Sequence, residues 1–285
     1  MKTGLILEGG AMRGMFTAGV TDVFLDENIY FDSIYAVSAG ACFGCSYKSK
    51  QKGRALRYNL KYCRDKRYCS LYSLITTGDL YGVKFCYEDL PKKLDIFDDE
   101  AYNNDKSEFY AVCTDVETGK ALYISCDKSD ERMITAIRAS ASMPLVSRIV
   151  ELDGKKLLDG GVADSVPIKK AQESGCEKCV VILTQPKGYI KKKNPLMKFS
   201  RIVLGKYPNL LKAMENRHTV YNETTAYIES EEEKGNIFVI RPPRPLDISR
   251  TEHNPEKLQS AYDLGAEEAR KCLSRLKEYL GYENS

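Results

Sequence analysis

The sequence predicts an α/β protein whose mainly parallel sheet is covered by helices on both faces. Short apolar runs alternate with helix-like segments through the first half of the chain, beginning with runs at 3–7 and 33–38. Nearly continuous apolar runs are typical of parallel strands that are buried on both sides. Two further runs, 108–115 and 120–125, are joined by "VETG" in the manner of a hairpin, which adds an antiparallel edge.

The individual helices and strands follow from periodicity and turn signals. Apolar residues at three- and four-residue steps predict a helix over 12–27, and a second helix is expected over 39–50. Residues 53–106 are charged and mostly helical, and the apolar stripe of 255–280 predicts one long amphipathic helix. The remaining elements are, in order, a helix at 129–141, a β-ribbon turning at Asp153-Gly154, a helix in 167–175, a strand in 179–186, a helix at 209–229 and a strand at 236–240.

The composition limits the class of function. With 285 residues, of which 43% are apolar, the chain is long enough for one large domain. Its 43 basic and 40 acidic residues give a net charge of +3, and we find no nucleic-acid-binding motif, so we expect no nucleic-acid partner. The N-terminus lacks the form of a signal peptide, and no segment approaches the ~18 apolar residues of a membrane span. We therefore expect a cytoplasmic protein, or at most one that is peripheral to a membrane.

The ten cysteines are expected to be mostly reduced in a cytosolic chain. Two pairs, Cys42/Cys45 and Cys176/Cys179, have the CxxC spacing that can bind zinc. However, the first pair falls in the expected helix at 39–50 and the second meets a buried strand, where cysteine packs as a small apolar residue. We interpret all four as packing residues and expect no metal.

A serine lies in a tight strand-to-helix turn, "AVSAG", at 36–40. This layout resembles a nucleophile elbow, in which the tight turn requires small residues two before and two after the serine. Ala36 and Gly40 meet that requirement, although glycine is usual at both places. An elbow would expose the Ser38 hydroxyl at a helix N-terminus, which favours developing negative charge. The alternative is a simple helix N-cap serine.

A glycine-rich turn, "EGGAMRG", follows the first strand at 8–14. A dinucleotide-binding turn would need glycine at Ala11 and an acid at the end of the second strand, and a P-loop would need Gly-Lys-Ser/Thr. Two interpretations remain: a tight turn with glycines for packing, or an oxyanion hole built from the N–H groups of Gly10, Ala11 and Met12. Because the first two parallel strands end at the same edge of the sheet, this turn and the serine turn are expected to be neighbours.

A serine nucleophile also needs a base. The two histidines, His218 and His253, both lie in the tail, and we interpret them as surface residues. A carboxylate is the other candidate, since Asp159 in "LLDGGVADSVP" follows a strand and precedes Gly160 and Gly161. Burial near the serine would raise its pKa from ~3.9 toward the working pH. The alternative is a turn aspartate that bonds its own backbone.

Together, and in this order, the glycine turn, the serine turn and "DGG" resemble the patatin-like phospholipase family. The blocks "CTDVETGKALY" and "IRASASMPLVSRIVELDGKKLLDGGVADSVP" are also similar to it, and the similarity covers about residues 3–185. The tail is similar to that of a bacterial subgroup. The resemblance implies a three-layer α/β/α fold related to the cytosolic phospholipase A catalytic domain. It also implies a Ser–Asp dyad without histidine, and no metal cofactor for the chemistry.

The resemblance assigns roles to individual residues. Ser38 would attack an ester carbonyl, and Asp159 would accept its proton and later activate water. Arg13 matches a basic position of the glycine turn, where it would brace the loop or meet a lipid phosphate. Relative to the family, Ala36 and Ala11 each replace a glycine. The expected oxyanion-hole residues are Gly9, Gly10, Ala11, Met12 and Ala39, and the supporting motif residues are Arg13, Gly14, Ala36, Gly40, Gly160 and Gly161.

We expect one patatin-like domain over 1–285, with a catalytic core at about 1–185 and a C-terminal helical extension at about 186–285 packed on it. The expected activity is a serine acyl hydrolase of the lipase or phospholipase A type, which cleaves lipid acyl esters through an acyl-enzyme. Two alternatives remain: a Ser-His-Asp esterase that uses His218 or His253, and a non-catalytic lipid-binding protein on the same fold.

The segment 187–212 carries eight basic residues, no acid and several bulky apolar residues. Such interleaving suits an interfacial element that contacts an anionic membrane peripherally. The alternative is a helix whose apolar side packs on the core and whose basic side is solvated.

Overall fold

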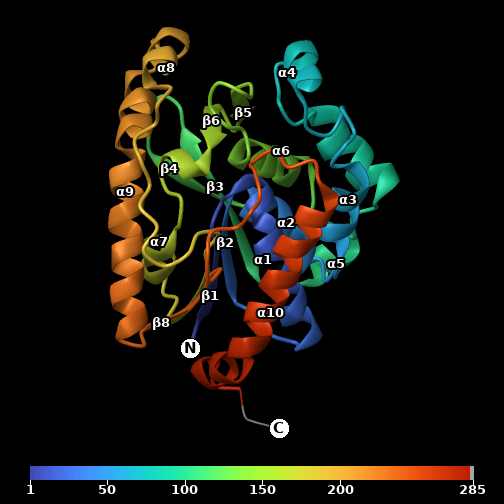
Figure 1. The fold of residues 1–285 in the computed structure, drawn as a ribbon, viewed down its shortest axis with the longest axis vertical. Helices are drawn as coiled ribbons and strands as arrows, with labels where there is room; N and C mark the ends of the chain where they lie inside the picture. The colour runs from blue at the N-terminus through green and yellow to red at the C-terminus, as the bar shows by residue number, and fades with distance from the viewer. Residues whose placement is uncertain (283–285) are drawn as a thin grey trace.

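The computed structural model describes residues 1–282 and contains an eight-stranded sheet with helices on both sides (Figure 1). Residues 283–285, the end of the expected domain, lie outside the described residues. The strand order is β5-β6-β3-β2-β1-β7-β8, and β4 also pairs with β3. The strands are β1 (Thr3–Leu7), β2 (Ser33–Val37), β3 (Glu108–Asp115), β4 (Ala121–Ser125), β5 (Val150–Leu152), β6 (Lys155–Asp159), β7 (Lys178–Ile182) and β8 (Ile237–Ile240).

The parallel part of the sheet runs through its centre. Strand β1 pairs with β2 and β7, β2 pairs with β3, and β7 pairs with β8, all in parallel. The β3–β4 hairpin and the β5–β6 ribbon are antiparallel, as their turn signals predict. Asp153 and Gly154 turn the ribbon with φ values of 50° and 73°, the positive values that a two-residue type I′ turn requires. The predicted fold class is confirmed.

The helices begin and end close to the predicted positions, and the last one begins and ends at the predicted residues. The α-helices are α1 (Gly14–Asp26), α2 (Ala39–Lys48), α3 (Arg54–Tyr62), α4 (Leu71–Thr77), α5 (Asp99–Asn104), α6 (Glu131–Ser140), α7 (Ile168–Glu173), α8 (Met197–Val203), α9 (Pro208–Glu233) and α10 (Pro255–Leu280). The chain also forms two short 3₁₀ helices, η1 (Ala11–Arg13) and η3 (Gly160–Val162). One π-helical segment, η2, spans Phe85–Leu94.

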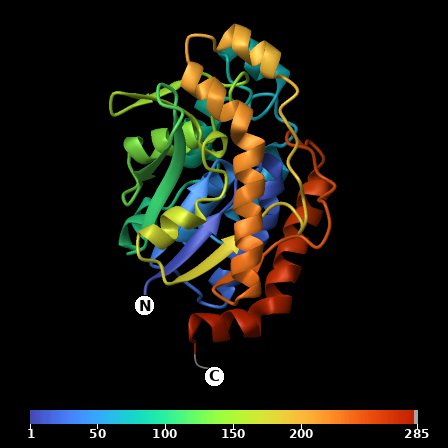
Figure 2. The ribbon, with the colours of Figure 1, turned by 90° about the vertical axis from the view of Figure 1, so that its left-hand side faces the viewer.

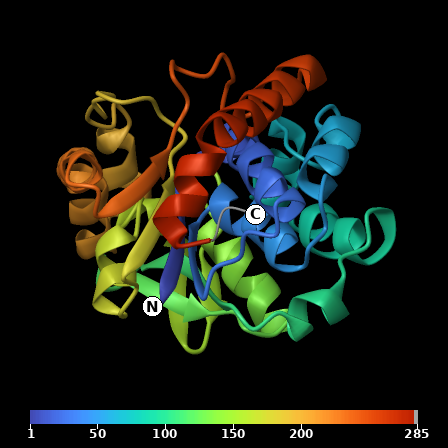
Figure 3. The same cartoon turned by 90° about the horizontal axis from the view of Figure 1, so that it is seen from below.

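Alternate residues of the central strands point into two different hydrophobic clusters. Leu5 and Leu7 of β1 pack with side chains of α1 and α10, whereas Ile6 packs with side chains of α7 and α9. Figures 2 and 3 show this arrangement, with α9 on one side of the sheet and α10 beside α1 on the other. The period of two along a strand therefore produces the three layers.

The C-terminal part of the chain contains one strand besides its helices, close to the strand expected at 236–240. Its strand β8 extends the sheet in parallel beside β7, and α9 and α10 pack on opposite faces. The apolar run "NIFVI" finds hydrogen-bond partners at an edge that β7 would otherwise leave open. None of the helices in residues 1–282 combines the length and the apolar character that a bilayer crossing requires.

Candidate active site

Ser38 occupies a strained turn between β2 and α2. Its backbone has a φ of 53° and a ψ of −119°, and residues other than glycine rarely adopt such a positive φ. Gly40 has no room for a side chain, because a Cβ there would lie 2.7 Å from the Leu7 carbonyl oxygen. The methyl group of Ala36, in contrast, is fully buried in the core. The turn presents the Ser38 hydroxyl at the beginning of α2.

Asp159, the last residue of β6, lies against Ser38. Ser38 Oγ donates a hydrogen bond of 2.7 Å to Asp159 Oδ2. The register of the sheet explains this contact, because β3 pairs Val112 with Val37 and the next residue, Cys113, with Asp159. Ser38 is 9% exposed and Asp159 is 6% exposed, so little water reaches the pair.

Two buried hydroxyl groups hold the pair in place. The Ser38 N–H group donates to Ser140 Oγ at 2.8 Å, and Ser140 Oγ donates to a β3 carbonyl at 2.6 Å. Thr114 Oγ1 donates to the Asp159 carbonyl oxygen at 2.8 Å. Neither Ser140 nor Thr114 can be singled out from the sequence, because a single hydroxyl residue has no motif of its own.

Burial raises the pKa of Asp159 above its ordinary value, although Arg217 and the hydrogen bond from Ser38 act in the opposite direction. The second carboxylate oxygen, Oδ1, accepts the Gly161 N–H group at 2.7 Å. Arg217 of α9 in turn donates from Nε to the Gly161 carbonyl oxygen. The sequence analysis missed Arg217, because α9 is a regular helix whose contact with this loop arises only on folding.

The glycine turn between β1 and α1 lies beside Ser38. Ala11, the first residue of η1, has a φ of 49°, a value that glycine adopts without strain but that other residues rarely adopt. The first N–H groups of a helical turn have no partner within that turn, and this applies to Ala11 of η1 and to Ala39 of α2. The predicted oxyanion-hole residues all line cavities at Ser38, namely Gly9, Gly10, Ala11, Met12 and Ala39.

The predicted supporting residues surround this centre. Arg13 ends η1 and lines one of the cavities, and Gly14 begins α1. Gly160 begins η3 directly after Asp159 and is packed against the β3 backbone. Folding therefore brings the three sequence motifs to one place.

Two cavities meet at Ser38. One has a volume of about 290 Å³ and lies between α2, η2 and α6, and the other has a volume of about 590 Å³ and lies between the glycine turn, α9 and residues 189–196. We call them the apolar chamber and the basic chamber. Ser38, Ala11 and Met143 line both. The apolar chamber is lined mainly by aromatic and aliphatic side chains, including Phe43, Tyr58, Leu90, Phe97, Met133 and Ile137.

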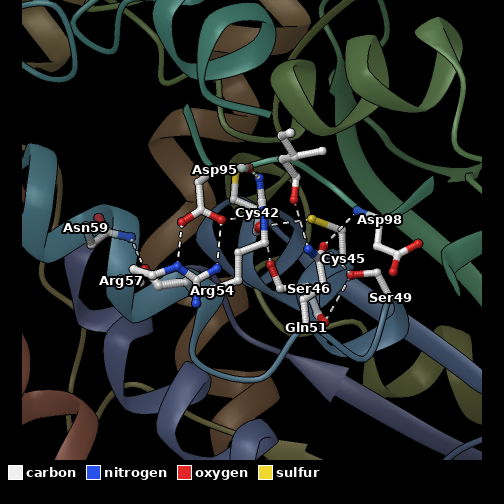
Figure 4. Close-up of polar contacts among 12 residues, drawn as sticks. Cys42, Cys45, Ser46, Ser49, Gln51, Arg54, Arg57, Asn59, Asp95 and Asp98 are labelled. Carbon is white, nitrogen blue, oxygen red and sulfur yellow. Dashed lines mark hydrogen bonds and ion pairs between the residues drawn. The ribbon is translucent and has the colours of Figure 1, made fainter. Parts of the chain in front are cut away.

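A buried ion pair fixes one wall of the apolar chamber (Figure 4). Arg54 Nη2 donates to the Asp95 carbonyl oxygen at 2.8 Å, and Arg54 Nε lies 3.4 Å from Asp95 Oδ1. Arg57 adds two hydrogen bonds of 2.8 Å to the same carboxylate. The Arg54 guanidinium also lies 5.2 Å from the centre of the Phe97 ring. These contacts tie α3 to the chain that follows η2.

The two CxxC pairs lie on opposite faces of the sheet. Cys42 and Cys45 line the apolar chamber, and burial raises the pKa of the Cys42 thiol to about 12, so this thiol stays neutral. Cys176 and Cys179 belong to the cluster that packs under α7 and α9. Within the part of the chain that the structure describes, no cluster of three or more potential metal ligands occurs.

Neither imidazole is hydrogen-bonded to Ser38 or Asp159 among residues 1–282. His218 lines the basic chamber from α9, and its Nδ1 lies 3.0 Å from the Glu215 carbonyl oxygen. His253 is exposed, and its Nδ1 contacts the Cys63 carbonyl oxygen. The surface position predicted for His253 agrees with the structure, whereas His218 is half-buried at the cavity wall.

The fold is a mixed α/β architecture with an eight-stranded sheet and helices on both sides. The chain belongs to the patatin-like phospholipase family, because the model of that family, described as "Patatin-like phospholipase", matches residues 5–171. Membership of this family identifies the general activity as lipid acyl ester hydrolysis. A second family model, a domain of unknown function called DUF6363, matches residues 207–281.

Two relatives illustrate the similarity. The chain is 27% identical over 270 residues to YjjU of Escherichia coli strain K12, which covers 93% of this chain and 75% of that protein. Among solved structures, it is similar to VipD from Legionella pneumophila with 12% identity and a TM-score of 0.49, over 96% of this chain and 67% of that one.

Proposed function

We propose that the protein hydrolyses lipid acyl esters with a Ser–Asp dyad, in which Ser38 is the nucleophile and Asp159 is the general base. The observation that carries this proposal is the hydrogen bond of 2.7 Å from Ser38 Oγ to Asp159 Oδ2. The positive φ of Ser38 supports it, because strained backbone of this kind is concentrated at functional sites.

The proposed reaction has two halves. Ser38 Oγ attacks the ester carbonyl carbon while its proton passes to Asp159, the bond to the leaving alcohol breaks, and Asp159 returns the proton to that alcohol. Water then attacks the acyl-enzyme and gives a proton to Asp159, the fatty acid leaves, and the proton returns to Ser38 Oγ. The raised pKa of Asp159 suits this exchange, because a base works best when its pKa approaches the operating pH.

The N–H groups of the glycine turn and of Ala39 are the proposed oxyanion donors. They begin helical turns beside Ser38, where partner-free N–H groups and the helix dipole favour negative charge. One such donor typically lowers the barrier by about 3–4 kcal/mol. The apolar chamber is the proposed acyl-chain site, because it opens at Ser38 and is lined mainly by apolar side chains.

The same proposal takes the whole chain as one patatin-like domain. The tail supplies β8 to the central sheet and supplies Arg217 to the loop that carries Asp159. A separate extension would make neither contact, so we expect the catalytic core to depend on residues after 186.

A fluorophosphonate probe tests the nucleophile. We expect wild type to be labelled and Ser38→Ala to be unlabelled, with hydrolysis of a chromogenic acyl ester lowered at least about a thousandfold in the variant. Ser129→Ala is the matched control, since Ser129 lines the same chamber and its Oγ is bonded to Asp99 instead. Wild type that takes up no label would favour a non-catalytic lipid-binding protein.

Histidine variants separate the dyad from a Ser-His-Asp triad. The dyad predicts that His218→Ala and His253→Ala both keep full activity toward the chromogenic ester. His218→Ala is the more stringent test, because this side chain lines the basic chamber. Loss of the fluorophosphonate label in either variant, with the fold intact, would support the triad.

An anionic membrane is the proposed surface on which the enzyme works. Exposed apolar side chains of α8 lie among basic residues, and Ile202 is 80% exposed. Helix α4 stands at the same end of the molecule (Figures 1 and 2), and its Ile75 is 84% exposed. Basic residues beside exposed apolar ones suit the headgroup region of an anionic bilayer.

A further inference from the structure

The basic chamber beside Ser38 has a large excess of positive charge. Two of its lining residues, Glu8 and Asp159, are carboxylates. The basic lining residues are six, namely Arg13, Lys191, Lys192, Lys193, Arg217 and Arg250. Four separate parts of the chain therefore contribute cations to one cavity.

Neutral donors already bind both carboxylates of the chamber. Glu8 accepts hydrogen bonds from the Tyr221 hydroxyl at 2.8 Å and from the backbone and side chain of Thr184. Asp159 accepts from Ser38 and from the Gly161 N–H group. The hydrogen bonds of the two acids therefore come from neutral groups, and the nearby cations act on them only through space.

Among residues 1–282, no ion pair within 4.0 Å joins a carboxylate to any of the half-buried Arg13, Lys191 and Arg217 or to the exposed Arg250. Arg13 Nε is buried without a hydrogen-bond partner. Lys191 Nζ lies 3.9 Å from the centre of the Tyr221 ring, and burial, together with the charge of Arg217, lowers its pKa to about 7. Glu8 and Asp159 offset part of this positive charge, but the cations still repel one another. Because such repulsion is unfavourable in a largely buried site, a bound anion would relieve it.

We propose that the basic chamber binds the headgroup of the ester substrate and selects a headgroup with net negative charge, a phosphate without an attached ammonium. This inference rests on the proposed hydrolase function and names the substrate class of that site. Guanidinium groups match phosphate oxygens in pairs, whereas an ammonium headgroup would meet further cations and two occupied carboxylates. The acyl chain lies in the apolar chamber, so that Ser38 meets the ester between them.

The residues after 186 supply most of this headgroup site. Lys191 comes from the chain after β7, Arg217 from α9 and Arg250 from the loop before α10, while Arg13 alone comes from the glycine turn. The tail therefore determines headgroup selectivity, and the motif residues of the first half determine the chemistry.

Three esters with one short acyl chain test the proposal: a monoacylglycerol, its 3-phosphate and the corresponding phosphocholine. They are used below the concentration at which they form micelles, so that attraction to a lipid surface plays no part. We expect kcat/KM for the 3-phosphate to exceed that for the phosphocholine at least about tenfold, which corresponds to one charge-assisted contact. Equal values for all three esters would overturn the proposal.

Matched variants show which residues produce the preference for the 3-phosphate. Lys191→Gln combined with Arg250→Gln should lower kcat/KM for the 3-phosphate at least about tenfold more than kcat/KM for the monoacylglycerol. Lys191→Arg should retain the preference. Lys198→Gln, on exposed α8 outside the chamber, is the control and should change none of the rates. An equal loss for all three esters, or a loss with Lys198→Gln, would contradict a headgroup site.

A binding measurement keeps this inference separate from the catalytic proposal. Calorimetry on Ser38→Ala should detect glycerol 3-phosphate, with weaker binding when Lys191→Gln and Arg250→Gln are added. Ser38→Ala could bind glycerol 3-phosphate while wild type shows no preference among the three esters. That result would indicate a site for free phosphate and would overturn the headgroup assignment. A failed fluorophosphonate test would leave this binding result unaffected.

Discussion

The hydroxyl of Ser38 and the carboxyl of Asp159 are nearly buried, and each is held by groups that sequence inspection does not single out. Ser140 fixes the backbone of the serine, and Thr114 fixes the backbone of the aspartate. Burial of Asp159 raises its pKa. The ionised form of this carboxyl is therefore less favourable in the folded protein than in the unfolded chain. The same burial that makes Asp159 a stronger base therefore lowers the stability of the fold when the carboxyl is ionised.

Asp159→Asn should abolish hydrolysis and stabilise the fold at neutral pH. The amide oxygen can still accept the Gly161 N–H group, and the NH2 group can donate to Ser38 Oγ, but the side chain carries no charge and cannot act as a base. Loss of the base should lower kcat at least about a hundredfold. Because the folded pKa is raised, the destabilisation of wild type appears as pH rises above the unfolded value of ~3.9 and levels off above the folded pKa. The variant's advantage in melting temperature should thus be largest at pH 7 and shrink toward pH 4.

Scanning calorimetry of wild type and variant across this pH range measures the effect. Asp247→Asn, at an exposed carboxyl, is the control and should show no comparable pH-dependent gain. A variant that is less stable than wild type at every pH would show that the ionised carboxyl stabilises the fold instead.

Among the helices and strands, the tightest packing between the C-terminal part of the chain and the first half is the crossing of α10 over α1. Glycines lie on both helices at this crossing: a Cβ on Gly265 would lie 2.0 Å from the Phe16 carbonyl oxygen, and a Cβ on Gly19 would lie 2.0 Å from that of Tyr262. Helix α1 continues directly from the glycine turn, so the position of α10 is coupled to the proposed oxyanion donors.

Gly265→Ala should destabilise the protein by about 1–3 kcal/mol, although alanine favours helix more than glycine does. The added methyl group meets backbone atoms, which cannot move aside as a flexible side chain would. The midpoint of urea unfolding measures the change. Ser260→Ala, on the exposed side of the same helix, should cause no loss, and an unchanged midpoint for Gly265→Ala would mean that the two helices can separate freely.

At the scale of the whole molecule, the exposed apolar residues of α4 and α8 distinguish one end from the rest of the surface. The chain next to α8 lines the basic chamber through Leu196, and the chain after α4 is bonded to its wall, where Leu80 N–H donates to the Val146 carbonyl oxygen at 2.8 Å. Both proposed membrane-contacting helices are therefore followed or preceded by residues that adjoin the wall of the basic chamber.

The double variant Ile75→Ser and Ile202→Ser should bind anionic vesicles at least about tenfold more weakly, since each fully inserted aliphatic side chain contributes about 1.5–3 kcal/mol. Its rate on a dispersed short-chain ester should not change. Vesicle sedimentation measures the binding, and Val220→Ser, at an exposed position of α9, is the control. Unchanged binding of the double variant, or an equal loss with Val220→Ser, would dismiss this surface.

Local patterns in the sequence determined the fold class, the hairpin, the turn at Asp153-Gly154 and the bounds of α10. These features depend on the spacing of apolar residues and on turn chemistry, which act over a few neighbouring residues. The three motifs also follow from the sequence, because a tight strand-to-helix turn imposes small residues on its own chain. The approach of the glycine turn to Ser38 follows from the expectation that parallel strands end together. Asp159 instead comes from β6, which is antiparallel to β3, and its place beside Ser38 was implied by the family resemblance.

Only the tertiary structure decided what surrounds these motifs. It placed β8 in the sheet, brought Arg217 to the Asp159 loop and joined Lys191, Arg217 and Arg250 with Arg13 in one chamber. A cation on a helix or in a loop has the same local pattern whether it faces water or a cavity. Its surroundings are set by packing between segments that are far apart in sequence, and that packing leaves no short-range signal in the chain.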